Sequence, residues 1–90
     1  MEEAEKILAR MRVTKSGFGQ KDFQTLYLYF GFHYREGRDR LYFHPRYREL
    51  VAQVGRHNKL AKGYAAHAVK LIDRLKELEA EDERKSKGAK

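Results

Sequence analysis

The feature that most constrains the fold is an apolar stripe that runs from Lys59 to about Leu78. Its residues recur at i, i+3 and i+4 spacing, so they share one side of a long helix. They are Ala61, Tyr64, Ala65, Ala68, Leu71, Ile72, Leu75 and Leu78. The other side carries Lys62, Lys70, Arg74 and Glu77. A chain of 90 residues forms one small domain with a thin core, so we expect this helix to cover a small sheet.

Two shorter helices are predicted ahead of it. Ile7, Leu8 and Met11 stand at helical spacing within residues 2–12. A second helix is expected from about residue 21 or 22 to residue 30, and Gly31 then occupies a C-cap position.

Three strands are predicted in the middle of the chain. They lie at about residues 32–35, 40–44 and 49–54. Gly37 suits a hairpin turn between the first two strands, and Pro45 ends the second. The expected fold class is α+β: a small α-β-β-β-α domain with an extra short N-terminal helix, in which a three-stranded antiparallel sheet packs on helices.

The same patterns divide the chain into three parts. Residues 1–20 are expected to be an N-terminal helix and connector, and residues 21–78 the α+β domain. Residues 79–90 lose their hydrophobic side chains and end in small and charged ones, which predicts a charged flexible tail.

The charge is concentrated in the middle of the chain. The protein has 20 Lys and Arg against 13 Asp and Glu, and residues 33–70 hold nine basic and only three acidic residues. Such a region is typical of proteins that bind the phosphate backbone of RNA, although a solvated basic face is the simpler alternative. The sequence shows neither an export signal nor a segment of membrane-spanning length, so we expect a cytoplasmic protein without a membrane partner.

A phosphate-binding role is predicted for the start of the long helix. Lys59 and Lys62 fall in its first turn, where cations are unfavourable unless an anion is bound, and Asn58 suits the N-cap. The alternative is that both lysines point into solvent at a small cost. Further RNA contacts are expected from Lys70, Arg35, Arg38, Arg40 and Arg46.

The order of elements and several short motifs resemble known RNA-binding families. The stretch GRHNKLAKGYAAHAV is similar to the last helix of double-stranded-RNA-binding domains. A closer resemblance, over about residues 5–78, is to the HicA family of toxin ribonucleases, which has the same fold. It is carried by KILARMR, KDF, the Gly31-Phe32 pair, RLYFHP after Gly37, and LAKGY. The resemblance implies an endoribonuclease that acts on RNA and is neutralised by an antitoxin protein.

The chain departs from this family at the residue that would cut RNA. In HicA-type proteins a Ser-His pair follows the glycine, and the histidine is catalytic. Here Arg38 and Asp39 follow Gly37, so Asp39 occupies the histidine position. Two flanking arginines leave this carboxylate weakly basic, and we expect it to be a turn residue that pairs with an arginine.

Four histidines remain as substitutes for the missing catalytic group. His33, His44, His57 and His67 could each reach RNA, but each is more simply an ordinary surface or half-buried residue. Their spacings of 11, 13 and 10 residues do not match a zinc site, and the chain has no cysteine. We therefore expect no metal and no cofactor.

Three functions remain open from the sequence. The favoured one is an RNA-binding protein that recognises structured RNA through its phosphates and is a diverged member of a toxin–antitoxin family. The second is an active toxin ribonuclease with a relocated catalytic group. The third is a basic module that binds an acidic protein partner.

Overall fold

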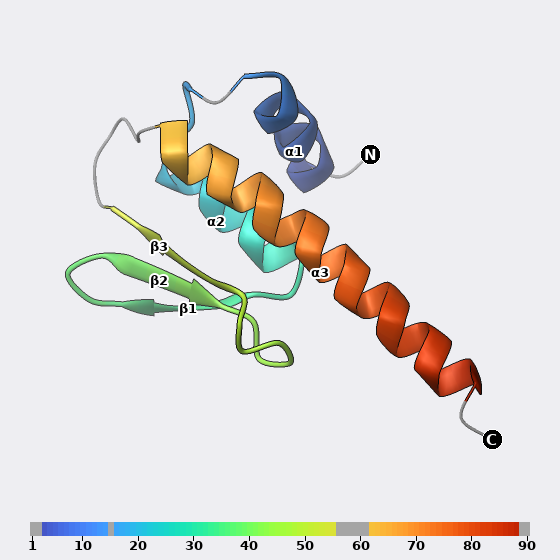
Figure 1. Cartoon of the computed structure of the whole chain (residues 1–90). Coiled ribbons are helices and arrows are strands. Elements are labelled where there is room, and N and C mark those ends of the chain that lie inside the picture. The colour runs from blue at the N-terminus through green and yellow to red at the C-terminus, as the bar shows by residue number, and fades with distance from the viewer. Residues whose placement is uncertain (1–2, 15, 56–61, 89–90) are drawn as a thin grey trace.

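The computed structural model describes residues 3–14, 16–55 and 62–88, with side chains of the last segment described from 63 to 85. The elements follow the predicted order. They are α1 (Glu3–Val13), α2 (Gln20–Tyr29), β1 (His33–Glu36), β2 (Arg40–Phe43), β3 (Val51–Val54) and α3 (Lys62–Gly88). The predicted α+β class is confirmed, with an antiparallel sheet in the order β1-β2-β3 (Figure 1).

A side-chain hydrogen bond marks the start of helix α2, and a glycine with positive φ follows its end. The Gly19 N–H donates to the carboxylate of Asp22 at 3.0 Å, which closes the first turn. At the other end Gly31 has a φ of 90°, a conformation that glycine adopts without steric cost. The C-cap residue is Phe30 and not the predicted Gly31, which follows it and turns the chain into the sheet.

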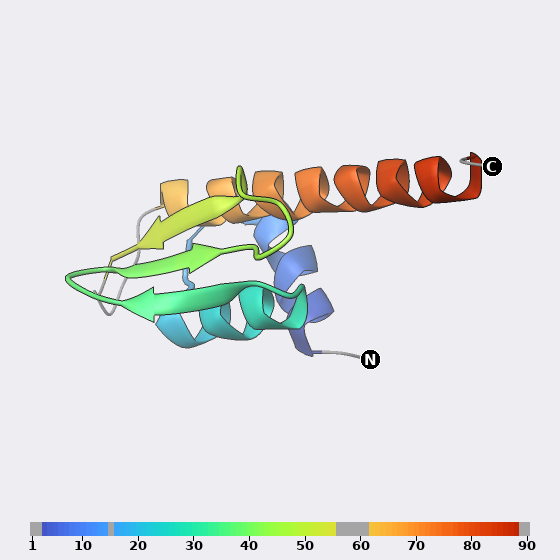
Figure 2. The same ribbon diagram turned by 90° about the horizontal axis from the view of Figure 1, so that it is seen from below.

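The register of the sheet separates its two faces. His33 pairs with Phe43 and Glu36 with Arg40, so residues 37–39 form the hairpin tip. Alternate side chains point to opposite faces of a sheet. The face turned to the helices carries Tyr34, Glu36, Arg40, Tyr42, Ala52 and Val54. All three helices lie on that side, and the other face is left open (Figures 1 and 2).

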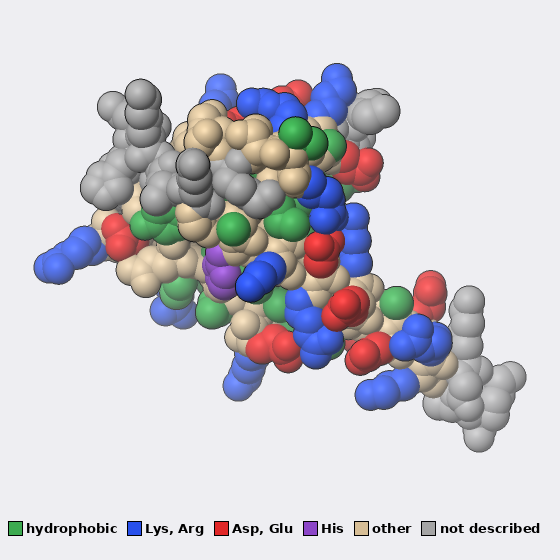
Figure 3. All heavy atoms as spheres, turned by 45° about the horizontal axis from the view of Figure 1, so that its top comes forward, with side chains coloured by type: hydrophobic (Ala, Val, Ile, Leu, Met, Phe, Trp, Pro, Cys, Tyr) green, Lys and Arg blue, Asp and Glu red, His purple; other side chains and the backbone are tan. Residues whose placement is uncertain are grey.

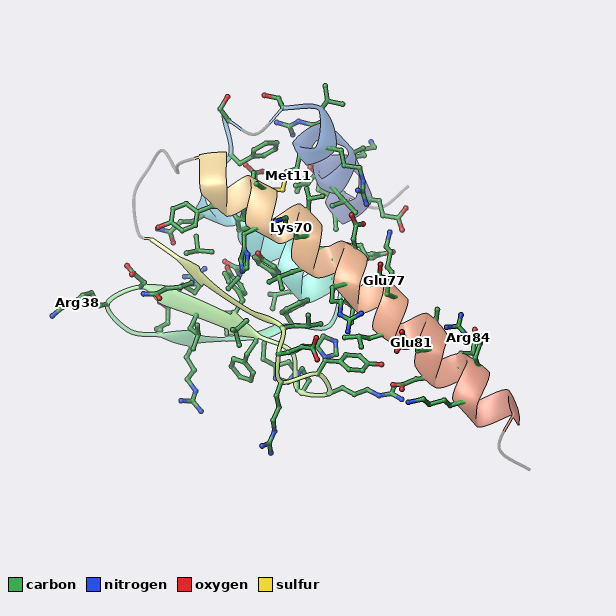
Figure 4. The ribbon with its side chains drawn as sticks, viewed as in Figure 1. Met11, Arg38, Lys70, Glu77, Glu81 and Arg84 are labelled. Carbon is green, nitrogen blue, oxygen red and sulfur yellow. The ribbon has the colours of Figure 1, made fainter. Side chains whose placement is uncertain are left out.

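The core joins all three helices to the sheet. Helix α1 buries Ala4, Ile7, Leu8 and Met11 in the same cluster as the other elements. Figure 4 shows Met11 between α1 and α3. The N-terminal helix, predicted ahead of the α+β domain, therefore contributes part of the core. The predicted stripe on α3 is confirmed from residue 64 onwards, since Ala65, Ala68, Leu71, Ile72 and Leu75 are buried.

The C-terminal segment differs from our expectation. Instead of a tail that starts at residue 79, α3 continues to Gly88 and projects beyond the sheet (Figure 1). Its Glu, Ala, Lys and Arg residues favour a helix without any need for burial. The Tyr47 hydroxyl also donates to Asp82 at 2.5 Å, and Arg46 forms an ion pair with Asp82 at 3.2 Å. These contacts tie the extension to the loop between β2 and β3.

One polar group in the core lacks a partner. The Tyr27 ring is fully buried and packs 4.5 Å from the Tyr42 ring and 5.0 Å from Phe32, measured between ring centroids. Its hydroxyl has no hydrogen-bond partner within the described part of the chain. Burial raises the pKa of this hydroxyl above its usual value. The hydroxyl therefore opposes folding at this position.

We predict that Tyr27→Phe leaves the free energy of unfolding unchanged or raises it by up to about 1 kcal/mol, because it removes an unpaired buried hydroxyl. Urea unfolding followed by circular dichroism measures this. Tyr42→Phe is the matched control, since the Tyr42 hydroxyl accepts from Arg40 at 3.5 Å and its loss brings no gain. A clear loss of stability in Tyr27→Phe would show that the hydroxyl has a partner.

Candidate nucleic-acid interface

A cavity lies at the outer edge of β3, where the start of α3 passes alongside it. Its volume is about 410 Å³, and it is a shallow hollow that is largely open to solvent. Gln53 of β3 lines it together with Gly63, Tyr64 and His67 of α3. An amide, a phenol ring and an imidazole therefore meet around one hollow.

Backbone groups of β3 are exposed at this edge. The His44 N–H donates to the Leu50 carbonyl at 3.1 Å, which continues the β2–β3 pairing by one step. Because hydrogen-bonded pairs alternate along an antiparallel ladder, the backbones of Val51 and Gln53 turn to the outer side. His67 Nε2 lies 3.0 Å from the Val51 carbonyl oxygen and so uses one of these groups.

That hydrogen bond fixes the tautomer of His67. A carbonyl oxygen can only accept, so Nε2 carries the hydrogen and donates it. In the neutral ring Nδ1 then holds an unprotonated lone pair. The side chain is exposed. His67 is therefore anchored through one nitrogen and able to accept a proton or hydrogen bond through the other.

A second contact holds α3 along the same edge. Arg74 Nε donates to the Glu49 carboxylate at 3.3 Å, just before β3 begins. His67, Lys70 and Arg74 follow at spacings of three and four residues, so they share one side of α3. Lys70 is exposed between the two anchored side chains and forms no ion pair with a described carboxylate.

Asp39, which occupies the histidine position of the HicA family, adjoins this cavity. Its carboxylate accepts from Gln53 Nε2 at 2.8 Å. We expected an arginine partner instead. Side chains 39 and 53 meet because the hairpin tip ends level with the β3 strand, a contact between residues 14 positions apart that spacing along the chain does not reveal.

Two of the predicted RNA contacts lie close in sequence to residues at or near the cavity. Arg38 stands at the hairpin tip beside Asp39 and points away from the body, and Lys70 lies one turn after His67 (Figure 4). Figure 3 shows a histidine on this face between hydrophobic side chains and a Lys or Arg side chain. Lys59 and Asn58 lie outside the described residues, as does the side chain of Lys62, so the predicted phosphate clamp stays a prediction.

Arg40, which was predicted to contact RNA, lies away from the cavity. Arg40 is used inside the hairpin, where it bonds Glu36 at 2.6 Å and Gln24 at 2.9 Å and lies over the Tyr34 ring. Its side chain is only 16% exposed, so we do not carry it forward as a phosphate contact.

Arg46 and Arg35 are also separate from the cavity. Arg46 pairs with Asp82 on the α3 extension. Arg35 is exposed on the open face of the sheet, with its guanidinium 5.8 Å from the centre of the Phe43 ring. The structure therefore divides the predicted basic surface among three regions of the molecule.

The remaining histidines are differently placed. His44 is buried, and its Nδ1 accepts from the Arg46 N–H at 3.1 Å. Its ring also packs edge-on against Phe32, with the ring centroids 5.2 Å apart, so the side chain serves the fold. His33 is exposed on the open sheet face, and His57 lies outside the described residues. Of the three described histidines, His67 is the one that lines the cavity.

The acidic residues near the middle of the chain form hydrogen bonds or ion pairs with neighbouring groups. Residues 6–72 contain 14 Lys and Arg but only four carboxylates. Each of the four has a partner: Asp22 caps α2, Glu36 pairs with Arg40, Asp39 with Gln53, and Glu49 with Arg74. The exposed cations beside the cavity therefore have little local competition for an anionic ligand.

The sequence analysis did not select two residues of the cavity, Gln53 and Tyr64. Gln53 was placed in a strand and Tyr64 in the apolar stripe, and neither position carried a signal of function. Their meeting depends on where α3 crosses the β3 edge, which only the tertiary structure shows.

Comparison with protein-family models, curated proteins and solved structures finds no match to this chain. The resemblance to HicA toxins therefore stays a prediction. Within the described ranges, no helix is both long and apolar enough to cross a bilayer. The same residues hold no group of three or more His, Cys, Asp or Glu arranged to bind a metal ion.

The burial of His44 predicts how stability depends on pH. Burial is the largest influence on its pKa and lowers it below the usual value. Below about pH 6.5 the unfolded chain binds a proton at this histidine that the folded chain does not bind until its lower pKa is reached. The free energy of unfolding should therefore fall as pH falls from 7 to 5. His44→Gln should flatten this fall, as denaturant titrations across that range would show; parallel curves for the two proteins would contradict the assignment.

Proposed function

We propose that this protein binds structured RNA at the cavity between β3 and α3, with phosphates contacted by Arg38 and Lys70. The observation that carries the proposal is the cavity itself, which Gln53, Tyr64 and His67 line together; Arg38 and Lys70 are exposed on the neighbouring hairpin tip and the next turn of α3.

The side chains of the cavity suit an unpaired base. The Tyr64 ring offers a stacking surface, and the Gln53 amide offers donors and an acceptor to the edge of a base. The bond to Asp39 uses one hydrogen of that amide and holds the group in place. A base displaced from a loop or bulge is the part of an RNA that such a site can hold, because paired bases remain stacked within the duplex.

The cations suit the adjoining backbone. Arg38 is exposed at the β1–β2 hairpin tip and Lys70 is exposed on α3, so the RNA backbone in this proposal passes over both parts of the molecule. Phosphate contacts of this kind release counterions, which makes affinity fall steeply with salt. Lys59 and Lys62 would extend the same surface at the start of α3.

We predict that Lys70→Gln weakens binding to a labelled RNA hairpin with an unpaired loop and lowers the slope of log affinity against log salt by roughly 0.7–0.9. Fluorescence anisotropy at several salt concentrations measures both quantities. Lys85→Gln is the matched control, because it removes an exposed lysine from the same helix far along its extension. Equal effects of the two variants would mean that only net charge matters and that Lys70 is not at the interface.

A second candidate function, RNA cleavage, is favoured by the anchored tautomer of His67. Cleavage without metal needs a base that removes the proton of a 2′-hydroxyl, and the free Nδ1 of His67 can take that proton. The 2′-oxygen then attacks the neighbouring phosphorus, and the 5′-oxygen leaves with a proton from solvent. This is the activity that the HicA resemblance implies, with His67 in place of the residue replaced by Asp39.

If cleavage occurs, His67→Gln should still bind the hairpin RNA but lose at least about 100-fold in cleavage rate, the typical contribution of a general base. Wild type and variant are incubated with end-labelled RNA in EDTA and resolved on native and denaturing gels. Lys85→Gln, on the α3 extension, serves as the control. Intact RNA with the wild-type protein would exclude cleavage of that RNA and leave binding as the function.

A further inference from the structure

The face of the sheet turned away from the helices forms a second surface. By the alternation of the strands it carries His33 and Arg35 of β1, Leu41 and Phe43 of β2, and Val51 and Gln53 of β3. We call these six residues the open sheet face. None of the three helices packs on it (Figure 2).

Two large apolar side chains of the open sheet face are exposed to solvent. Leu41 is 37% and Val51 43% exposed, and both rank among the large hydrophobic residues most open to solvent. Phe43 is half-buried. It lies on the central strand β2, two residues after Leu41 and opposite Val51 of β3. Exposed apolar side chains that adjoin one another are typical of an interaction surface.

Aromatic and cationic groups meet at the centre of this surface. His33 and Phe43 stand directly opposite each other in the β1–β2 ladder, with their ring centroids 5.9 Å apart. The Arg35 guanidinium lies 5.8 Å from the centre of the same Phe43 ring. The six side chains include no carboxylate.

That chemistry argues against a second copy of the chain as the occupant. A two-fold interface would bring the same face to itself and place Arg35 and its counterpart on one buried surface without an acidic partner. An anionic ligand with flat rings meets both features of the face, since aromatic rings stack on bases and arginine contacts phosphate or stacks as well.

We propose that the open sheet face binds single-stranded nucleic acid, with Phe43 and His33 stacking on unpaired bases and Arg35 contacting the backbone. The ligand is a nucleic acid in this proposal and in the proposed function, but the binding surface differs. His67 and Lys70 lie on α3 at the edge of the sheet, whereas Phe43 and His33 lie on its open face. Gln53 lies where the two surfaces adjoin.

The test measures the Kd of the full chain for fluorescently labelled decauridylate and decaadenylate by anisotropy. Phe43→Leu removes the ring and keeps an apolar side chain, and Arg35→Gln removes the charge. Each variant should raise the Kd for the decamers by at least about fivefold, the low end for loss of one stacking contact. Thermal unfolding of each variant establishes that it is folded.

Lys85→Gln is the matched control, because it removes an exposed lysine on the α3 extension, away from the open sheet face; it should leave the Kd for the decamers unchanged. Lys70→Gln should weaken the hairpin RNA more than the decamers, whereas Phe43→Leu and Arg35→Gln should weaken the decamers more than the hairpin. That opposite ranking supports two separate surfaces. A wild-type protein that binds decamers but not the hairpin would contradict the proposed function and leave this inference standing.

Three results would overturn the inference. The first is a wild-type protein that does not bind the decamers, and the second is a decamer Kd that neither Phe43→Leu nor Arg35→Gln changes. The third is a wild-type dimer in analytical ultracentrifugation that Phe43→Leu converts to a monomer, which would identify the face as a self-interface.

Discussion

The packing of α3 across the other elements is the interaction on which the rest of the structure depends. One stripe of its side chains, from Ala65 to Leu75, is buried, and it contacts both α1 and β3. No second sheet or additional layer is present in the described residues, so this single helix completes the core of a small domain. The same packing places α3 along the outer edge of β3. His67 and Arg74 are thereby brought to that edge and bond to Val51 and Glu49.

A one-sided arrangement leaves two kinds of surface on a three-stranded sheet. The β3 edge is partly closed by α3, and the space that remains between them is the cavity lined by Gln53, Tyr64 and His67. Among the described elements, no helix covers the open sheet face, and its Phe43 ring is flanked by His33 and Arg35. The acidic residues near the middle of the chain are held in a helix cap, an amide contact and two ion pairs, so neither surface presents an unengaged carboxylate. The positive side chains on both surfaces are suited to an anionic ligand, which is the premise of both proposals.

Much of the fold could be predicted from the sequence because its signals are local. The spacing of Ile7, Leu8 and Met11, the turn at Gly31 and the stripe on α3 each depend on neighbours within one or two turns. The site could not be predicted in the same way, because its contacts join distant positions. Arg40 was expected at the surface, but Gln24 and Glu36 draw it inside the hairpin. The extension of α3 was expected to be a tail because it lacks apolar residues, whereas helix propensity and the Tyr47–Asp82 contact maintain it.

The central claim is that RNA binds at the junction of β3 and α3, and a nuclear magnetic resonance titration tests it most directly. Backbone amide resonances of the full chain would be followed while an unlabelled RNA hairpin with an unpaired loop is added. The account predicts that the largest changes fall on Arg38, Asp39, Gln53 and residues 63–70, while α1 and the α3 extension beyond Glu77 change little. Largest changes on α1, or around Arg46 and Asp82, would contradict it.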